Sequence, residues 1–227
     1  MNKFVHLHCH SPFSFLDGAG EIKDLVKRAV EMEMPALAIT DHDNLCAAVK
    51  FSQVSRQAGI KPVQGVEITL EGGQHLTLLA QSQRGYSSFC QLLTHAHLNN
   101  LRGEPVVNQA DLEKIEDIII LSGCRRGVLA PLILQGRYRE AGEQAIFYRN
   151  LLGKEHFYVE LQNTLLPGDR YLNHRLLELA QQVGVEVVAS NNVHYANHQE
   201  FFLYDLLTCV RTLTTVEEVH QERPLNG

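Results

Sequence analysis

The sequence predicts an α/β fold with a parallel sheet, and three observations support this. Seven short β-rich runs recur along the chain, at positions 4–8, 36–40, 63–69, 75–80, 118–122, 157–161 and 185–190. Segments with helical apolar spacing alternate with these runs through most of the chain, which is typical of strands joined by helical crossovers. The length of 227 residues suits a closed or nearly closed α/β barrel, whose active site lies at the carboxyl ends of the strands.

Helices are predicted between the runs. The pattern is clearest at positions 21–33, where the apolar residues are Ile22, Leu25, Val26, Ala29 and Val30. Similar patterns occupy positions 44–58, 86–98, 138–152, 170–183 and 199–210. Gly72 and Gly73 predict a tight turn, so that the runs on either side form a hairpin. Positions 101–109 are turn-rich and predict an exposed loop.

The composition is that of a globular chain without a basic footprint. Apolar residues make up 44% and charged residues 20%, and the net charge is -6 at pH 7. This balance is unlike that of a dedicated nucleic-acid binder, although bound divalent cations would supply positive charge beside a phosphate. No run approaches the roughly 20 apolar residues of a membrane helix, and the start lacks the apolar stretch of a signal peptide. We therefore expect a cytoplasmic protein without membrane contact, whose five scattered cysteines are reduced.

Twelve histidines exceed what packing requires and direct attention to metal binding. His8 and His10 lie two apart on the first predicted strand, so their side chains project to one face and can chelate one cation. Asp17 follows a Ser-Pro loop that can turn back over the strand end, where a carboxylate suits a second cation. His42 lies at the start of the loop after the second run. Glu67 lies in an apolar run, where burying a carboxylate without a partner is costly.

The later runs bring further ligand types to the same expected edge. His75 begins the fourth run, Cys124 follows the fifth, and Asn192 and His194 follow the seventh. Imidazole, carboxylate and thiol suit zinc, and without the thiol they suit manganese or iron. Each residue also has a plainer interpretation, such as a buried small hydrophobe for Cys124 or a turn residue for His42. Together, at one end of the sheet, they predict a metal site.

Other polar residues are not expected to bind metal. His6 lies deeper in the first strand, where packing or a supporting contact is expected. His95 and His97 point about 200° apart on a predicted helix and cannot chelate one ion. Asp41 is open to a turn role in which it bonds its own backbone, and Arg125 to either a substrate phosphate or solvent. The histidines expected at the surface are His156, His174, His198 and His220.

Six short motifs resemble those of a known family, in this order: His8-Cys9-His10, Thr40-Asp41-His42, Gly65-Val66-Glu67, His75-Leu76-Thr77, Ser122-Gly123-Cys124 and Asn192-Val193-His194. The chain resembles the PHP (polymerase and histidinol phosphatase) domain, specifically the amino-terminal one of the bacterial DNA polymerase III alpha subunit and its error-prone relatives. The phrases at 37–45 and 121–124 look like the polymerase branch more than the small-molecule phosphatase branch.

The resemblance implies a distorted seven-stranded (β/α)7 barrel of the PHP type with up to three divalent cations, zinc or manganese. Its implied ligand sets are His8, His10, Glu67 and Asn192 for the first ion; Asp17, His42 and His194 for the second; and His75 and Cys124, with bridging Glu67, for the third. The residues implied to act in catalysis through bound metals are His8, His10, Glu67 and His194. The family usually has Asp where Asn192 stands, and a neutral amide binds a cation less strongly.

The function that the resemblance implies is metal-dependent phosphodiester hydrolysis of the 3′–5′ exonuclease, proofreading type, at DNA 3′ ends. A second hypothesis is a metal-stabilised but catalytically silent scaffold for a polymerase and its replisome partners, favoured by Asn192 and the acidic balance. A third is a free-standing phosphatase for a small phosphomonoester, which the short chain permits.

We expect residues 1–212 to form this domain and residues 213–227 to begin the connection to a polymerase region. Positions 216–226 resemble the stretch by which polymerases leave the domain, and the tail ends without a capping element, as expected of a chain cut from a longer one. The carboxylates of a polymerase palm are not in this sequence. The chain alone is therefore not expected to polymerise DNA.

Overall fold

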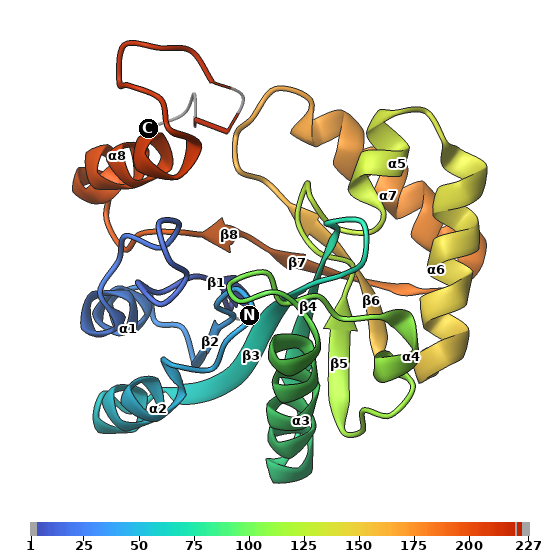
Figure 1. Cartoon of the computed structure of the whole chain (residues 1–227), viewed down its shortest axis with the longest axis horizontal. Coiled ribbons are helices and arrows are strands. Elements are labelled where there is room, and N and C mark those ends of the chain that lie inside the picture. Colours follow the sequence, from blue (N-terminus) through green and yellow to red (C-terminus); the bar gives the residue numbers. More distant parts are fainter. Residues whose placement is uncertain (1–3, 221, 224–227) are drawn as a thin grey trace. The chain divides into compact units, whose positions relative to one another are not determined.

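The computed structural model describes residues 4–220, 222 and 223. Helices and strands alternate along most of the chain, which gives a mixed α/β fold (Figure 1). The chain divides into two compact units, Met1–Gln64 with Asn192–Gly227, and Gly65–Asn191. Strand β3, Lys61–Thr69, begins in the first unit and ends in the second.

The first unit contains short strands and four helical elements. They are β1 (His8–Cys9), α1 (Ile22–Glu31), β2 (Ala36–Ile39), α2 (Ala48–Gln57), the start of β3, β8 (Asn192–Val193), the 3-10 turn η1 (His198–Glu200) and α8 (Phe201–Thr212). β1 pairs in parallel with β8, and β2 pairs in parallel with the start of β3. The amide of Ala38 donates to the carbonyl of His6 at 2.9 Å, and the amide of Thr40 donates to that of Cys9 at 2.8 Å. β1 is thereby held between β8 and β2.

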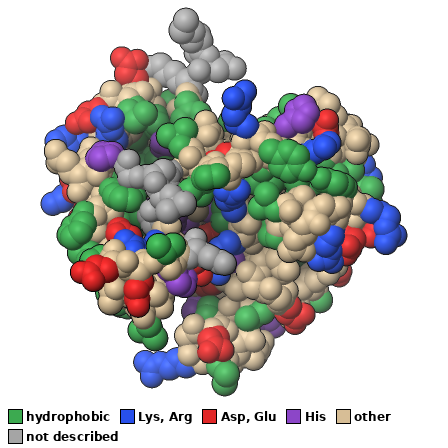
Figure 2. Space-filling view, turned by 90° about the horizontal axis from the view of Figure 1, so that it is seen from above, with side chains coloured by type: hydrophobic (Ala, Val, Ile, Leu, Met, Phe, Trp, Pro, Cys, Tyr) green, Lys and Arg blue, Asp and Glu red, His purple; other side chains and the backbone are tan. Residues whose placement is uncertain are grey.

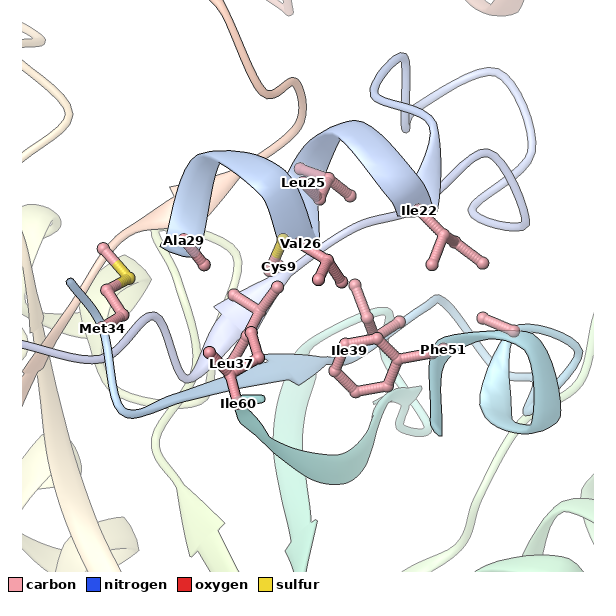
Figure 3. Close-up of a cluster of buried hydrophobic side chains, with 11 residues drawn as sticks. Cys9, Ile22, Leu25, Val26, Ala29, Met34, Leu37, Ile39, Phe51 and Ile60 are labelled. Carbon is pink, nitrogen blue, oxygen red and sulfur yellow. The ribbon is translucent and has the colours of Figure 1, made fainter. Parts of the chain in front are cut away.

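The core of the first unit lies between α1, β2 and α2 (Figure 3). α1 buries Ile22, Leu25, Val26 and Ala29 at the spacing of one helix face, as the sequence predicted, and its fifth apolar residue, Val30, is exposed. The buried partners from the other elements are Cys9, Leu37, Ile39, Phe51 and Ile60. Because side chains alternate along a strand, the packing of Cys9 in this core turns its two neighbours, His8 and His10, to the opposite face.

The second unit holds most of the larger sheet. Its elements after the end of β3 are β4 (His75–Ala80), α3 (Gln83–Asn99), α4 (Gln109–Leu112), β5 (Ile118–Leu121), α5 (Ala130–Leu134), α6 (Tyr138–Leu152), β6 (Phe157–Gln162), α7 (Asp169–Val183) and β7 (Glu186–Ser190). β5, β6 and β7 are parallel neighbours, whereas β4 is antiparallel to both β3 and β5. The otherwise parallel sheet is thus interrupted at β4.

The reversal of β4 follows from the predicted hairpin, which is confirmed. Gly72 and Gly73 have φ of 94° and 79°, a left-handed conformation that favours glycine in a tight turn. The hairpin sets Thr69 opposite His75. The first residue of β4 thus lies at the carboxyl end of β3, and this brings His75 to the sheet edge where the parallel strands end.

The predicted count of seven strands is not confirmed. In the described residues one sheet has six strands, in the order β2-β3-β4-β5-β6-β7, and a second has two, β1 and β8. The first run, expected at 4–8, forms a strand only at His8–Cys9. The helix expected at 44–58 begins at Ala48, because the side chain of Asn44 accepts from the amide of Cys46 at 3.0 Å and holds a turn there.

On the face shown in Figure 2, acidic and basic side chains are interspersed. Among the described residues, no helix has both the length and the apolar character needed to cross a bilayer. α8 ends at Thr212, and the final positions of the expected connecting stretch, 224–227, lie outside the described residues.

Candidate metal centre

His8 lies on β1 and His10 directly follows the strand; neither side chain has exposed surface, and their ring centroids are 5.3 Å apart. The pairing of β1 with β8 sets His8 opposite Asn192. The predicted chelate therefore lies on one face of the strand, with a predicted ligand from the other end of the chain beside it. His194 follows β8 directly.

A tight turn carries Asp17 back to this strand. The amides of Ser14 and Gly18 donate to the carbonyls of Ser11 and Ser14, each at 2.9 Å, and the amide of Ala19 donates to the carbonyl of His194 at 2.7 Å. A Cβ atom at Gly18 would lie 1.9 Å from the carbonyl oxygen of Ser11. Only glycine fits this turn without moving its backbone.

Three donors of the first unit converge. One ligand atom each of His10, Asp17 and His194 lie within 4.8 Å of one another. Asp17 Oδ2 is 3.0 Å from His42 Nε2 and 3.4 Å from His194 Nδ1. The ring of His10 stacks between those of His42 and His194, with centroid distances of 4.5 and 4.8 Å. The predicted second-ion set, Asp17, His42 and His194, is thus together.

Burial and charge act in opposite directions at this cluster. Burial raises the pKa of Asp17, but the imidazoles of His194 and His42 outweigh it and hold that pKa well below its ordinary value. Burial also lowers the pKa of His194. Both shifts favour the protonation states that bind metal, an ionised carboxylate and a neutral imidazole.

Ser14 and Asp41 set the tautomer of His10. The hydroxyl of Ser14 donates to Asp41 Oδ1 at 2.7 Å, so its oxygen accepts from His10 Nδ1 at 2.8 Å. Nδ1 therefore carries the proton, and Nε2 presents its lone pair, as a metal ligand requires. Asp41 also accepts from the amide and hydroxyl of Ser11, at 2.7 and 2.6 Å. The turn role that the sequence left open for Asp41 is therefore not found, since Asp41 bonds a loop 27 to 30 residues away.

Asn192 faces that lone pair. Its Oδ1 lies 3.0 Å from Nε2 of His10. A neutral imidazole whose proton is on Nδ1 cannot donate from Nε2, so two acceptors face each other across this distance. A cation shared by the two atoms resolves the repulsion, and the donors of the first unit therefore fit a divalent metal ion.

A second group of predicted ligands gathers in the second unit. Glu67 Oε1 lies 3.2 Å from His75 Nδ1 and 3.7 Å from the sulfur of Cys124. All three side chains are buried. Burial, followed by the charge of Glu67, raises the pKa of the Cys124 thiol well above its ordinary value. A thiolate here needs a cation beside it, and imidazole, carboxylate and thiolate together form a zinc-type donor set.

Glycine positions this second group. Gly123 has φ of 85°, and a Cβ atom there would lie 2.7 Å from the carbonyl oxygen of His75. The amide of His75 donates to the carbonyl of Arg126 at 3.0 Å. The loop after β5 is thus pressed against the start of β4, which brings Cys124 to His75.

Several polar residues near these groups were not predicted. In the second unit Glu160 is buried and accepts from Gln162 Nε2 at 2.8 Å and from the hydroxyl of Ser190. Glu67 was predicted because it is a carboxylate within an apolar run. Glu160 lies in such a run too, at 157–161, and could have been found by the same pattern. In the first unit Tyr204 stacks on His194 at 4.8 Å, and Arg211 Nη2 lies 3.3 Å from Asp17 Oδ1. No local pattern marks these two residues of α8.

The residues expected to stay apart from metal have other contacts. His6 lines a cavity of about 150 Å³ beside α1, and its Nδ1 has no hydrogen-bond partner within the described part of the chain. Arg125 bonds the carbonyl of Pro167 at 3.1 Å and Asp169 at 3.2 Å, so it fastens the loop before α7. His156 is half-buried and bonds the carbonyl of Ile118 at 3.1 Å, which corrects its expected surface position.

Comparison with known proteins identifies related sequences. The model of the PHP domain family matches residues 6–164. The error-prone DNA polymerase of Symbiobacterium thermophilum is 46% identical over 98% of this chain, and the DNA polymerase III alpha subunit of Borreliella burgdorferi is 33% identical over 93%. The alpha subunit of Escherichia coli K12 is 34% identical over 99%.

These alignments cover only part of each relative. The chain spans about a fifth of the length of the curated relatives it matches, 22% of the Symbiobacterium polymerase and 20% of the other two.

Solved structures with a similar fold are distant in sequence. An amidohydrolase of Chromobacterium violaceum aligns with a TM-score of 0.58 and 14% identity, over 84% of this chain and 87% of that one. A protein of Bifidobacterium adolescentis assigned as a metal-dependent phosphoesterase aligns with a TM-score of 0.51, also at 14% identity and the same coverage. At this identity the likeness shows the fold alone.

Proposed function

Because the chain belongs to the PHP domain family, we propose that it is the metal-dependent phosphoesterase domain of a DNA polymerase III alpha-type polymerase. Its proposed reaction is phosphodiester hydrolysis of the 3′–5′ exonuclease type at DNA 3′ ends. The observation that carries the proposal is the convergence of His10, Asp17 and His194, buried donors of the types that divalent metals select.

We propose that the ligand sets expected from the sequence hold up to three divalent ions, zinc or manganese. They are His8, His10, Glu67 and Asn192; Asp17, His42 and His194; and His75 and Cys124 with Glu67. When bound, such ions supply Lewis-acid charge that activates water and stabilises the phosphoryl oxygens in the transition state. The similarity to alpha-type polymerases also supports the proposed partners, which are a DNA 3′ end and the rest of such a polymerase. The proposed location is the cytoplasm.

The protein's own residues prepare this chemistry. Ser14, held by Asp41, keeps the proton of His10 on Nδ1 and aims its other nitrogen at the cluster. Asp17 is ionised because the neighbouring imidazoles depress its pKa. These contacts hold the side chains together within the protein, which lowers the cost of assembling a reactive geometry.

A catalytically silent, metal-binding scaffold is the second candidate. The observation that favours it is Asn192, whose amide lies 3.0 Å from His10 where the family usually has a carboxylate. A neutral oxygen stabilises a cation less than a charged one, so occupancy of the first ion is the step that separates the two functions.

The test combines elemental analysis of the purified chain with degradation of a 3′-labelled single-stranded DNA in added manganese or zinc. For the nuclease we expect two to three ions per chain and 3′–5′ degradation that disappears in His10→Ala. Bound metal without cleavage would favour the scaffold, and chains without metal would overturn both.

Two further variants test the ligand assignment. Glu67→Ala is expected to remove two ions, because Glu67 is proposed to bridge the first and third. His6→Ala is the matched control, since His6 lines a separate cavity beside α1, and its metal content should not change. Equal loss in both variants would contradict the assignment.

A further inference from the structure

Arg211 lies in the last turn of α8 and reaches the candidate metal centre. Its Nη2 is 3.3 Å from Asp17 Oδ1, whereas Oδ2 of the same carboxylate faces His42 at 3.0 Å. Asp17 thus offers one oxygen to the imidazoles and the other to a guanidinium. A permanent positive charge at this place opposes the binding of cations, so its presence needs another explanation.

A second carboxylate contacts the guanidinium from the residues after α8, of which 213–220, 222 and 223 are described and are called the tail here. Arg211 Nη1 donates to the carboxylate of Glu222, whose side chain is 43% exposed. The tail reaches this position because Arg223 forms two bonds with Asp205 of α8, at 2.9 and 2.8 Å. The third donor, Arg211 Nε, is buried and has no hydrogen-bond partner among the described residues.

These contacts describe a site for an anion. A guanidinium presents a planar fork of donors that matches the oxygens of a carboxylate or a phosphate. Here one carboxylate, Asp17, is buried and belongs to the metal-binding cluster. The other, Glu222, has a side chain that is 43% exposed. Its carboxylate contacts Nη1 of the guanidinium, whereas Asp17 contacts Nη2.

We propose that Arg211 binds a backbone phosphate of the nucleic-acid substrate, and that Glu222 covers this position until the substrate displaces it. The inference rests on the proposed phosphodiester substrate, but it concerns binding rather than cleavage. A phosphate placed at Arg211 lies next to the residues proposed to hold the metal, so the arrangement positions the substrate. The tail then competes with the substrate for one side chain.

The experiment measures binding of a fluorescently labelled single-stranded oligonucleotide to the whole chain by anisotropy, with a chelator present so that no cleavage occurs. Glu222→Gln removes the competing charge and is expected to tighten binding several-fold. Arg211→Gln is expected to weaken it about tenfold, the loss of a charge-assisted contact. The double variant should bind like Arg211→Gln, because the gain requires the guanidinium. Inorganic phosphate should compete more effectively against Glu222→Gln than against the native chain.

Matched controls distinguish an effect at Arg211 from a general effect of the net charge on DNA binding. Glu217→Gln removes the same charge from an exposed position of the same tail and should leave binding unchanged. Arg139→Gln removes an exposed guanidinium of the second unit and should also have little effect. Thermal melting of each variant checks folding, and Glu222→Gln, which alters only an exposed side chain, keeps the test valid if Arg211→Gln is unstable.

The results have distinct meanings. Equal tightening by Glu222→Gln and Glu217→Gln would overturn the proposal, as would native binding by Arg211→Gln or no binding by any variant, Glu222→Gln included. Failure of the proposed function would show instead as absent cleavage with metal, while the binding differences between the variants persist.

Discussion

His10 is fixed by a chain of hydrogen bonds that begins outside the metal-binding residues. Asp41 accepts a hydrogen bond from the Ser14 hydroxyl, whose oxygen in turn accepts one from Nδ1 of His10. The order of donors leaves a lone pair on Nε2, where a metal ligand needs it. A residue that binds no metal therefore decides whether His10 can.

Ser14→Ala is expected to lower metal affinity by roughly 10 to 100-fold, because it removes the acceptor that fixes the ring and leaves Asp41 with one fewer donor. Equilibrium dialysis against manganese or zinc measures the change. Ser87→Ala, at an exposed position of α3, is the control and should bind like the native chain. Unchanged affinity in Ser14→Ala would contradict the role of the hydroxyl.

Gly18→Ala is expected to destabilise the protein by about 1–3 kcal/mol, the usual result of forcing an extra carbon into a packed site. The added Cβ would lie 1.9 Å from the backbone oxygen of Ser11, so the turn that presents Asp17 must open. Urea unfolding measures the stability. Gly142→Ala is the matched control, because its Cβ would meet only Leu179 at 3.7 Å and alanine favours a helix. Similar losses in both variants would exclude the clash as the cause.

The helices α1 and α2 pack against β2, and this core holds β1 in position. Cys9 of β1 packs with Leu37 and Ile39 of β2 and with Phe51 of α2. Cys9 therefore faces this core, and its sequence neighbours His8 and His10 face the opposite side of the strand. The same core that stabilises the first unit aims its metal-binding residues.

Phe51→Ala is expected to cost about 3–5 kcal/mol of unfolding free energy, since it removes a fully buried ring from this core. Phe202→Ala, whose ring on α8 is 65% exposed, should cost much less. Denaturant unfolding of both variants measures the difference. Similar destabilisation would show that Phe51 does not anchor the core as its burial indicates.

The tail depends on the pair between Asp205 and Arg223. The hydrogen bond from Arg223 lowers the pKa of Asp205 below its ordinary value. A carboxylate with a lowered pKa stabilises the folded state above its unfolded pKa of about 4, and this contribution is lost as pH falls through the folded pKa. The tail should therefore stay docked at neutral pH and detach in acid.

Asp205→Asn is expected to detach the tail at neutral pH, because it removes the charge that holds Arg223. A protease that cleaves after glutamate should then cut at Glu217 and Glu218 faster than in the native chain. Asp24→Asn, at a half-buried position in the first turn of α1, is the control. Equal cleavage rates in all three proteins would show that other contacts hold the tail.

For the whole molecule, bound metal is expected to raise the free energy of unfolding, because the donors converge only in the folded chain. A ligand at a hundredfold excess over its dissociation constant adds about 2.7 kcal/mol per site. Thermal melting with added manganese or zinc should show this increase, and a chelator should reverse it. His10→Ala should respond less, whereas a response equal to that of the native chain would place the metal elsewhere.

Much of the fold could be predicted because its signals are local. The run at 75–80 and the helix at 138–152 coincide with β4 and α6, since apolar periodicity and strand or helix formation act over the same few residues. The hairpin followed from Gly72 and Gly73. The short length of β1 did not, because its strand geometry depends on pairing with β8, 184 positions away in the register of His8 and Asn192.

The sequence by itself determined the element types, the family and the ligand types, because spacing and side-chain chemistry are properties of short segments. Only the tertiary structure decided which donors meet, as His194 and Asp17 do across 177 positions. It also gave Ser14 and Arg211 their roles, because the contacts of a polar side chain depend on segments that folding brings beside it. Such contacts leave no periodic pattern in the chain.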